Sequence, residues 1–300
     1  MKKILLFTVF LILSINLTGK LLDLESERVI EQIYHRDKDG VILGKSEKKH
    51  INNHKNAIIF IHGFLSSPKI FEHSFNEFKR KNIFDIYVPR LPFHGKNLQE
   101  ASKFNNEEII DYMSKYINKK SSKYKKLTVV AFSYAASNVI AMDKMKKIPE
   151  NVEIVLLSPS IFIKSNSKIN KKLLSVYHPL FRKYCNYELL GCKNVGYESG
   201  DKYAKDFLIK EQPLSYIVVP ALKELFKIDT ENRSHLKNIS KPFNIIMSQD
   251  DNQVNFKDIE HSCSKNKNCN MTSFATGKHL FMVGEHKNEY LKKIEAIAKK

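Results

Sequence analysis

Short apolar runs alternate along the chain with longer segments whose apolar residues recur every three or four positions. Continuous apolar runs bounded by polar residues are typical of strands that are buried on both faces. Such runs predict strands over 56–64, 83–91, 126–132, 152–160, 242–251 and 269–276. Nearer the N-terminus, the segment 28–46 predicts a short hairpin with Asp39-Gly40 as its turn.

The segments between these runs have the spacing of amphipathic helices. The segment 67–82 carries apolar side chains at Ile70, Phe71, Phe75 and Phe78. Ser67 is placed to cap this helix, with Pro68 at its first position. The same spacing predicts helices over 106–120, 133–147, 254–265 and 285–300.

This alternation predicts an α/β fold with a doubly wound, mainly parallel sheet that is covered by helices on both faces. One interval, 158–240, contains no clear strand–helix–strand unit. A loop of that length without structure of its own is uncommon, so we expect an inserted helical lid over the carboxyl edge of the sheet. The core of the fold is then formed by 20–157 and 241–300.

The first residues have the pattern of an export signal. Two lysines precede an apolar stretch over 4–18, which is shorter than the roughly 20 residues that span a membrane. Gly19 is a small residue at which cleavage would end a signal over 1–19, and an uncleaved anchor in the inner membrane is the alternative. We therefore expect an exported protein, either periplasmic or secreted.

The chain is strongly basic, with a formal net charge of +18, and only six of its 50 basic residues are arginine. Lysine is a point charge, whereas reading of phosphate groups favours the planar guanidinium. The lysines are spread along the whole sequence, which favours a compositional bias of the source, followed by weak attraction to an anionic membrane surface. Nucleic-acid binding ranks third because no known binding motif accompanies the charge.

Four cysteines form two local pairs, Cys185 with Cys192 and Cys263 with Cys269. An even number of cysteines in an exported chain favours one disulfide in each pair. Zinc binding has little support because neither pair has the C-x-x-C spacing. Free buried thiols are the remaining interpretation.

Polar side chains with catalytic chemistry stand at the ends of several predicted strands. The apolar run AIIFI, residues 57–61, is followed by His62-Gly63-Phe64, and the strand over 126–132 is followed by Ser133. The later strands are followed by Asp250-Asp251 and by Gly277-Lys278-His279. Because ligands of a parallel sheet bind at the carboxyl ends of its strands, serine, aspartate and histidine are expected at one edge.

A serine hydroxyl becomes a nucleophile when a histidine, itself oriented by a carboxylate, takes its proton. The chain order Ser, Asp, His and a serine on a strand-to-helix turn are features of the G-x-S-x-G type of site. Here the pentapeptide runs from Ala131 to Ala135, so alanine replaces both glycines. The substitution departs from the pattern but nearly meets its requirement for small residues.

With these residues the chain resembles the α/β-hydrolase superfamily, in particular bacterial carboxylesterases and monoacylglycerol lipase or lysophospholipase-like enzymes. The resemblance rests on the segments FIHGFLSS, PRLPFHGKN, VVAFSYAAS, SQDDNQVN and GKHLFMV. It covers about residues 55–160 and 240–300 and does not extend to the predicted lid.

The resemblance implies a role for each matching residue. Ser133 matches the nucleophile and His279 the base, and Asp251 matches the acid because Val254 completes the family's D-x-x-V pattern. The oxyanion hole would use the backbone N–H groups of Phe64 and Tyr134. His62 and His94 are expected to shape loops, and His261 and His286 are less well placed as bases, while no metal or organic cofactor is implied.

The expected activity is therefore hydrolysis of a small-molecule ester or lipid by a serine esterase or lipase-like enzyme. The same triad also serves thioesterases, peptidases and acyltransferases, and fold analogy does not choose among them. An inactive member of the fold that binds an apolar ligand is the alternative from another class. The predicted lid would supply the acyl pocket.

Overall fold

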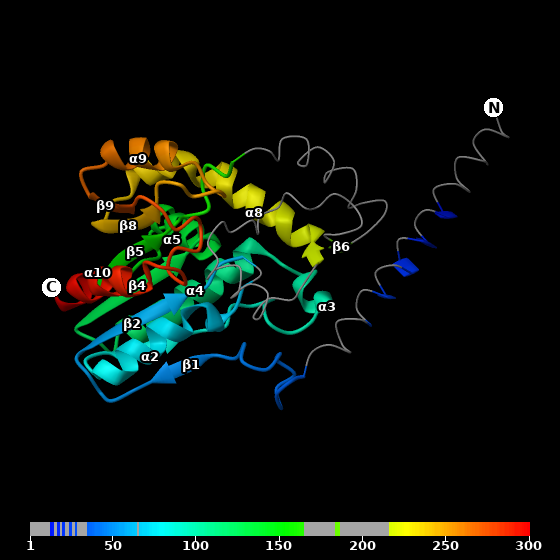
Figure 1. The fold of residues 1–300 in the computed structure, drawn as a ribbon, viewed down its shortest axis with the longest axis horizontal. Coiled ribbons are helices and arrows are strands. Elements are labelled where there is room, and N and C mark those ends of the chain that lie inside the picture. Colours follow the sequence, from blue (N-terminus) through cyan, green and yellow to red (C-terminus); the bar gives the residue numbers. More distant parts are fainter. Residues whose placement is uncertain are drawn as a thin grey trace.

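The computed structural model describes residues 35–64, 66–164, 184–186 and 216–300, together with scattered helical positions between 13 and 28 (Figure 1). In this part of the chain a seven-stranded sheet has the order β1-β3-β2-β4-β5-β8-β9. The strands of this sheet are β1 (Lys48–His50), β2 (Asn56–Ile61), β3 (Asp85–Val88), β4 (Lys126–Phe132), β5 (Val152–Leu157), β8 (Phe243–Ser248) and β9 (Cys269–Phe274). All neighbouring strands are parallel except β1, which pairs antiparallel with β3. The prediction of a mainly parallel sheet is confirmed.

Helices cover both faces of the sheet (Figure 1). The helices are η1 (Pro68–Phe71), α2 (Glu72–Lys81), α3 (Leu98–Ala101), α4 (Asn106–Ser121), α5 (Tyr134–Lys144), α8 (Val219–Asn232), η3 (Arg233–Asn238), α9 (Phe256–Ser264) and α10 (Lys287–Lys299). Side chains alternate between the two faces along each strand, as the twofold period of a strand requires. Ile59 and Val129 pack in the core beneath α4, α5 and α8, whereas Ile58 and Val130 pack beneath α2 and α10.

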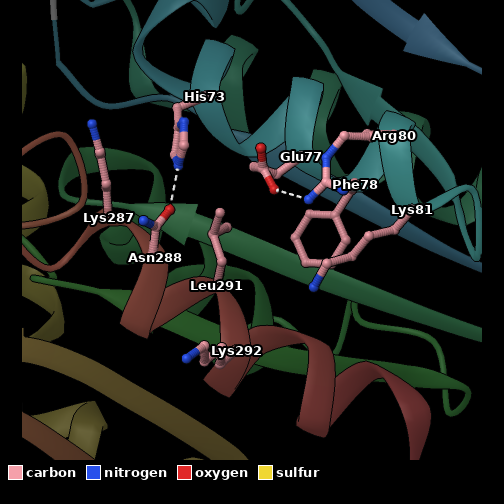
Figure 2. Close-up of a pocket in the computed structure, with 9 residues that line it drawn as sticks. All are labelled: His73, Glu77, Phe78, Arg80, Lys81, Lys287, Asn288, Leu291 and Lys292. Carbon is pink, nitrogen blue, oxygen red and sulfur yellow. Dashed lines mark hydrogen bonds and ion pairs between the residues drawn. The ribbon is translucent and has the colours of Figure 1, made fainter.

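A cavity of about 550 Å³ lies between α2 and α10 (Figure 2). Its wall combines the apolar side chains of Phe78 and Leu291 with charged groups, and His73 Nε2 lies 2.8 Å from Asn288 Oδ1. The cavity therefore lies between two helices that cover the same face of the sheet. None of the strand-end residues named in the sequence analysis lines it.

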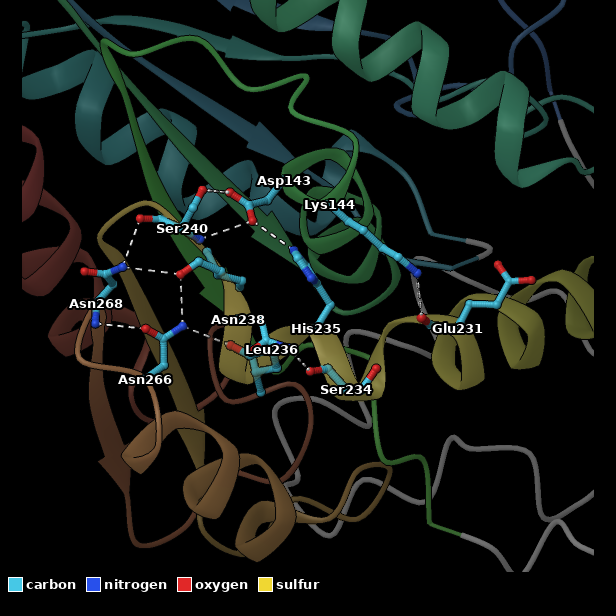
Figure 3. Close-up of polar contacts among 11 residues, drawn as sticks. Asp143, Lys144, Glu231, Ser234, His235, Leu236, Asn238, Ser240, Asn266 and Asn268 are labelled. Carbon is cyan, nitrogen blue, oxygen red and sulfur yellow. Dashed lines mark hydrogen bonds and ion pairs between the residues drawn. The ribbon is translucent and has the colours of Figure 1, made fainter.

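A polar cluster ties α5 to the chain that leads into β8 (Figure 3). The buried carboxylate of Asp143, at the end of α5, contacts His235 Nε2 at 2.9 Å and Ser240 Oγ at 3.1 Å. A buried carboxylate needs such partners to offset its loss of hydration. The cluster fixes the position of α5, the helix that begins directly after Ser133.

The interval 158–240 is only partly described, since residues 165–183 and 187–215 lie outside the described residues. Within it β6 (Tyr184–Asn186) pairs antiparallel with β7 (Tyr216–Val218), and α8 then packs against α5. The carboxylate of Asp229 on α8 accepts a hydrogen bond from the backbone N–H of Phe162 at 2.8 Å and from Arg233 Nε at 2.8 Å. The segment that leaves β5 is thus tied to α8, while the lid itself stays a prediction.

The remaining predictions for covalent and terminal features have different outcomes. A disulfide joins Cys263 to Cys269, with a Cα–Cα distance of 5.4 Å, which confirms that pair. The pair Cys185 and Cys192 lies outside the residues whose side chains are described. Most of the proposed signal over 1–19 also lies outside them. Among the described residues, no helix has the length and apolar character needed to cross a membrane.

Candidate active site

Ser133 occupies a sharp turn between β4 and α5 at the carboxyl edge of the sheet. Its backbone has φ 54° and ψ −114°, a conformation that side-chain-bearing residues rarely adopt. Such a backbone costs of order 1–3 kcal/mol and persists only where the surroundings hold it. Here the N–H of Ser133 donates to Leu157 O at 2.8 Å, and Ser137 N–H donates to Ser133 O at 3.2 Å.

The surroundings of this turn are crowded. A Cβ placed on Gly63 would lie 3.0 Å from Ser133 Cβ, so the segment that follows β2 passes directly against the turn. Ala131 and Ala135, the residues on either side of the turn, are fully buried. A larger side chain at either position would have no room, and alanine meets the steric requirement that glycine meets in the family pattern.

The structure brings three of the sequence-predicted residues together in one hydrogen-bonded chain. Ser133 Oγ lies 2.9 Å from His279 Nε2, and the other ring nitrogen, Nδ1, lies 2.9 Å from Asp251 Oδ2. These residues come from the ends of β4, β8 and β9, as the topology of a parallel sheet predicts. The arrangement can pass a proton from a hydroxyl to an imidazole that a carboxylate orients.

Asp251 is fully buried and its carboxylate is well supplied with donors. Its Oδ1 accepts hydrogen bonds from the backbone N–H groups of Gln253 at 2.8 Å and Val254 at 3.0 Å. Burial alone would raise the pKa of Asp251, but the neighbouring His279 and these hydrogen bonds together hold the pKa below its ordinary value. The group is therefore a carboxylate, and His279 Nδ1 must carry the proton that faces it.

The adjacent Asp250 has a different set of contacts. Its carboxylate accepts a hydrogen bond from the backbone N–H of Lys278 at 3.0 Å and forms an ion pair with Lys278 Nζ at 3.0 Å. Lys278 itself has a positive φ of 54° and precedes His279 in the chain. Asp250 thus holds the loop that presents His279, and the imidazole contact belongs to Asp251.

The two histidines expected to shape loops are both buried near this edge. His62 Nε2 accepts a hydrogen bond from Leu91 N–H at 3.1 Å, so the proton on Nδ1 is the one directed at Gly63 O, 3.1 Å away. Burial, followed by the proximity of His94, lowers the pKa of His62 well below its usual value. A neutral imidazole therefore joins the segment after β2 to the segment after β3.

Phe64 lies in the segment after β2, and Tyr134 is the first residue of α5, directly after Ser133. Their rings contact each other, with centroids 6.1 Å apart. The first N–H groups of any α-helix lack a partner within the helix and carry its positive dipole end. The start of α5 is thus a place where a developing negative charge would be stabilised.

Tyr134 is anchored by a buried polar chain. Its hydroxyl donates to Asn106 Oδ1 at 2.5 Å, and Asn106 Nδ2 donates to the backbone oxygen of Glu224 on α8 at 2.8 Å. Burial raises the pKa of Tyr134 far above its ordinary value, so the hydroxyl stays protonated and remains a donor. No sequence pattern indicates these hydrogen bonds, because residues 106, 134 and 224 are far apart in the sequence.

A second side chain, besides that of His279, contacts the Ser133 hydroxyl and was missed in the sequence. Ser160 Oγ lies 2.8 Å from Ser133 Oγ, and the backbone N–H of Ser160 donates to Ser133 O at 3.1 Å. The only available signal was a serine shortly after a neighbouring strand end. Among the residues described by the structure, no group of three or more His, Cys, Asp and Glu side chains could hold a metal ion.

Comparison with known proteins finds similar chains among the solved structures. No protein-family model matches the chain, and no curated protein matches it. The chain resembles one of the solved structures described as "LipS and LipT, two metagenome-derived lipolytic enzymes", with a TM-score of 0.67 and 16% identity over 87% of this chain and 100% of the other. It also resembles a soluble variant of monoglyceride lipase from Saccharomyces cerevisiae, with a TM-score of 0.65 and 15% identity over 84% and 89%.

A lipase-esterase related protein from Clostridium acetobutylicum is similar as well, with a TM-score of 0.62 and 22% identity over 84% of this chain and 98% of the other. At these identities the likeness establishes the fold. The chain has the α/β-hydrolase fold, as the resemblance in its motifs predicted.

Proposed function

We propose that the chain is a serine hydrolase that cleaves carboxylic esters through an acyl-enzyme. The observation that carries the proposal is the chain of contacts from Ser133 Oγ to His279 Nε2 at 2.9 Å and from His279 Nδ1 to Asp251 Oδ2 at 2.9 Å. The strained backbone of Ser133 supports it further, since strain of this kind persists at functional sites.

In this mechanism the Ser133 hydroxyl attacks the ester carbonyl while His279 Nε2 takes its proton. Asp251 stabilises the imidazolium that forms, and the N–H groups of Phe64 and Tyr134 stabilise the oxyanion. His279 then protonates the oxygen of the leaving group as its bond to the carbonyl carbon breaks, so an alcohol departs and an ester of Ser133 remains. Water that gives a proton to the same imidazole attacks this ester, the bond to Ser133 Oγ breaks, and the imidazolium returns the proton to Oγ while the acid leaves.

Several features support an apolar ester or lipid as the substrate. The neighbouring solved structures are described as lipolytic enzymes, a monoglyceride lipase and a lipase-esterase related protein. The rings of Phe64, Phe104 and Tyr134 pack on one another beside the turn, with Phe64 and Phe104 centroids 5.5 Å apart. Phe104 and Tyr134 are buried, and Phe64 is the partly exposed member of this group, so its ring is the one that could contact an acyl chain or an apolar alcohol.

Features outside the site support export of the enzyme and its attraction to membrane surfaces. The basic and then apolar N-terminal residues and the disulfide between Cys263 and Cys269 support export. The net charge of +18 supports weak attraction to anionic membrane surfaces, where lipid esters are found.

A fluorophosphonate probe tests the proposal, because it reacts covalently with an activated serine and does not react with an ordinary one. We expect the purified protein to become labelled at Ser133 and to hydrolyse a short p-nitrophenyl ester. Ser133→Ala should lose both properties. Absence of labelling in a folded protein would refute the enzyme and favour the inactive, ligand-binding alternative, whereas labelling without ester turnover would favour a thioesterase, peptidase or acyltransferase.

A further inference from the structure

Ser160 stands in contact with the proposed nucleophile and has no part in the mechanism described so far. It lies in the segment that follows β5, and its side chain is buried. Because β5 is the parallel neighbour of β4, with Phe132 opposite Leu157, the chain beyond each strand end emerges at the same place. The Ser160 hydroxyl is thereby held 2.8 Å from Ser133 Oγ.

The ionised carboxylate of Asp251 determines the direction of each hydrogen bond in the series that runs from Asp251 through His279 and Ser133 to Ser160. A carboxylate only accepts, so His279 Nδ1 carries a proton toward Asp251. In the neutral imidazole Nε2 is then an acceptor, and Ser133 must use its one proton to donate to it. The contact between the two serines can therefore only be a donation from Ser160 to Ser133 Oγ.

We propose that Ser160 is a positioning residue for the nucleophile, a proposal that rests on the proposed esterase function. Its donated hydrogen bond occupies one lone pair of Ser133 Oγ and holds the hydroxyl in the rotamer that faces His279. As the proton leaves for His279, negative charge develops on Ser133 Oγ, and the Ser160 hydroxyl stabilises it. Hydrogen bonds to charged groups are stronger than neutral ones, so the contact favours the attacking state.

The Ser160 hydroxyl is not needed to hold its own segment in place. Nearby backbone groups anchor the segment, since Ser158 N–H donates to Ile246 O at 3.1 Å and Phe162 N–H donates to Asp229 Oδ1 at 2.8 Å. Ile163 also forms a bridge with Val254. Removal of one oxygen atom from Ser160 should therefore leave the segment and the fold intact.

The experiment measures the second-order rate constant of fluorophosphonate labelling at Ser133. In that reaction the Oγ–phosphorus bond forms, the phosphorus–fluorine bond breaks, fluoride leaves and the Ser133 proton passes to His279. We expect Ser160→Ala to label roughly 5- to 50-fold more slowly than the parent protein, the loss expected for one hydrogen bond to a developing charge. Ester turnover should show the same loss in kcat with little change in KM.

Two further variants separate the hydroxyl from its volume and position. Ser160→Thr keeps the hydroxyl and should recover most of the labelling rate. Ser158→Ala is the matched control, because Ser158 Oγ is also buried but has no hydrogen-bond partner in the described part of the chain. It should label at the parental rate, and all variants should keep the parental unfolding midpoint.

The outcomes separate this proposal from the one on which it rests. If the parent protein labels at Ser133 and Ser160→Ala labels equally fast, only the role of Ser160 is wrong. A loss in Ser160→Ala that Ser160→Thr does not recover, or that Ser158→Ala reproduces, would also overturn it. If the folded parent protein is not labelled at all, the esterase proposal fails and the role of Ser160 fails with it.

Discussion

Replacement of Asp251 by Asn changes the chemistry of the site while keeping its shape, and it should nearly abolish ester hydrolysis. Oδ1 of Asp251 accepts from the N–H groups of Gln253 and Val254, so an Asn side chain would keep its oxygen on those donors. Its amide NH₂ would then replace Oδ2, the atom 2.9 Å from His279 Nδ1. An N–H group facing Nδ1 favours the imidazole tautomer whose proton is on Nε2, which cannot accept the proton of Ser133.

The size of the effect follows from this loss of the base. The same exchange in the catalytic triad of serine proteases lowers kcat by about 10⁴-fold, and we expect a loss of about 10³- to 10⁴-fold here with little change in KM. Asp250→Asn is the matched control next to it in the chain. Its carboxylate forms an ion pair with Lys278 in which both side chains are about a third exposed, and an exposed pair contributes about 0–1 kcal/mol. We therefore expect less than about a fivefold loss in that variant.

The assay compares the purified parent protein and both variants on p-nitrophenyl butyrate at one pH, with urea unfolding curves to show that each is folded. The reasoning would be refuted if Asp251→Asn stayed within tenfold of the parent. A greater loss in Asp250→Asn than in Asp251→Asn would show that the wrong neighbour has been chosen as the acid.

Three further results are expected. Ser133→Ala and His279→Ala should each remove ester hydrolysis without a change in the far-ultraviolet circular dichroism spectrum, and activity retained in either variant would exclude that residue from its proposed role. Replacement of both Cys263 and Cys269 by Ser should lower the free energy of unfolding by about 2 kcal/mol in urea titrations. An unchanged free energy of unfolding would show that the disulfide adds nothing to stability. Burial lowers the pKa of His94 to about 4 from the ordinary 6.5, so between pH 6.5 and pH 4 the unfolded chain binds a proton at His94 that the folded chain does not. His94 alone should therefore lower the free energy of unfolding by about 1.4 kcal/mol per pH unit toward pH 4, in addition to the fall caused by His62, and His94→Gln should reduce the slope by this amount.

Much of the core could be predicted because apolar runs and helical spacing record burial directly. The strand over 126–132 and the helix that starts beside Ser133 both follow from local pattern, and the structure has them as β4 and α5. Ser133, Asp251 and His279 could be proposed together because a parallel sheet places all strand ends at one edge. The helix after Pro68 begins as a 3-10 turn, η1, before α2, a detail that spacing does not reveal.

Other parts of the structure differ from what the local sequence pattern predicts. The edge strand β1 is the polar triplet Lys48–His50, which has no apolar alternation. Of the hairpin predicted over 28–46, residue 28 is helical and residues 35–46 are described, with a single bridge that joins Arg36 to Ile42. The contact of Ser160 with Ser133 depends on which strands are neighbours, and strand order is a property of the whole fold.

The tie between Asp229 and Phe162 has a consequence for how this protein can change over evolution. This hydrogen bond joins the segment that follows β5 to α8, the helix that precedes η3 and β8. The two parts of the core are therefore joined by a contact that does not involve the residues inserted between Phe162 and α8. For a segment held at both ends, each doubling of length costs only about 0.6 kcal/mol in loop closure. The core is therefore expected to tolerate changes in the length of the chain between Phe162 and Asp229 at little cost in stability.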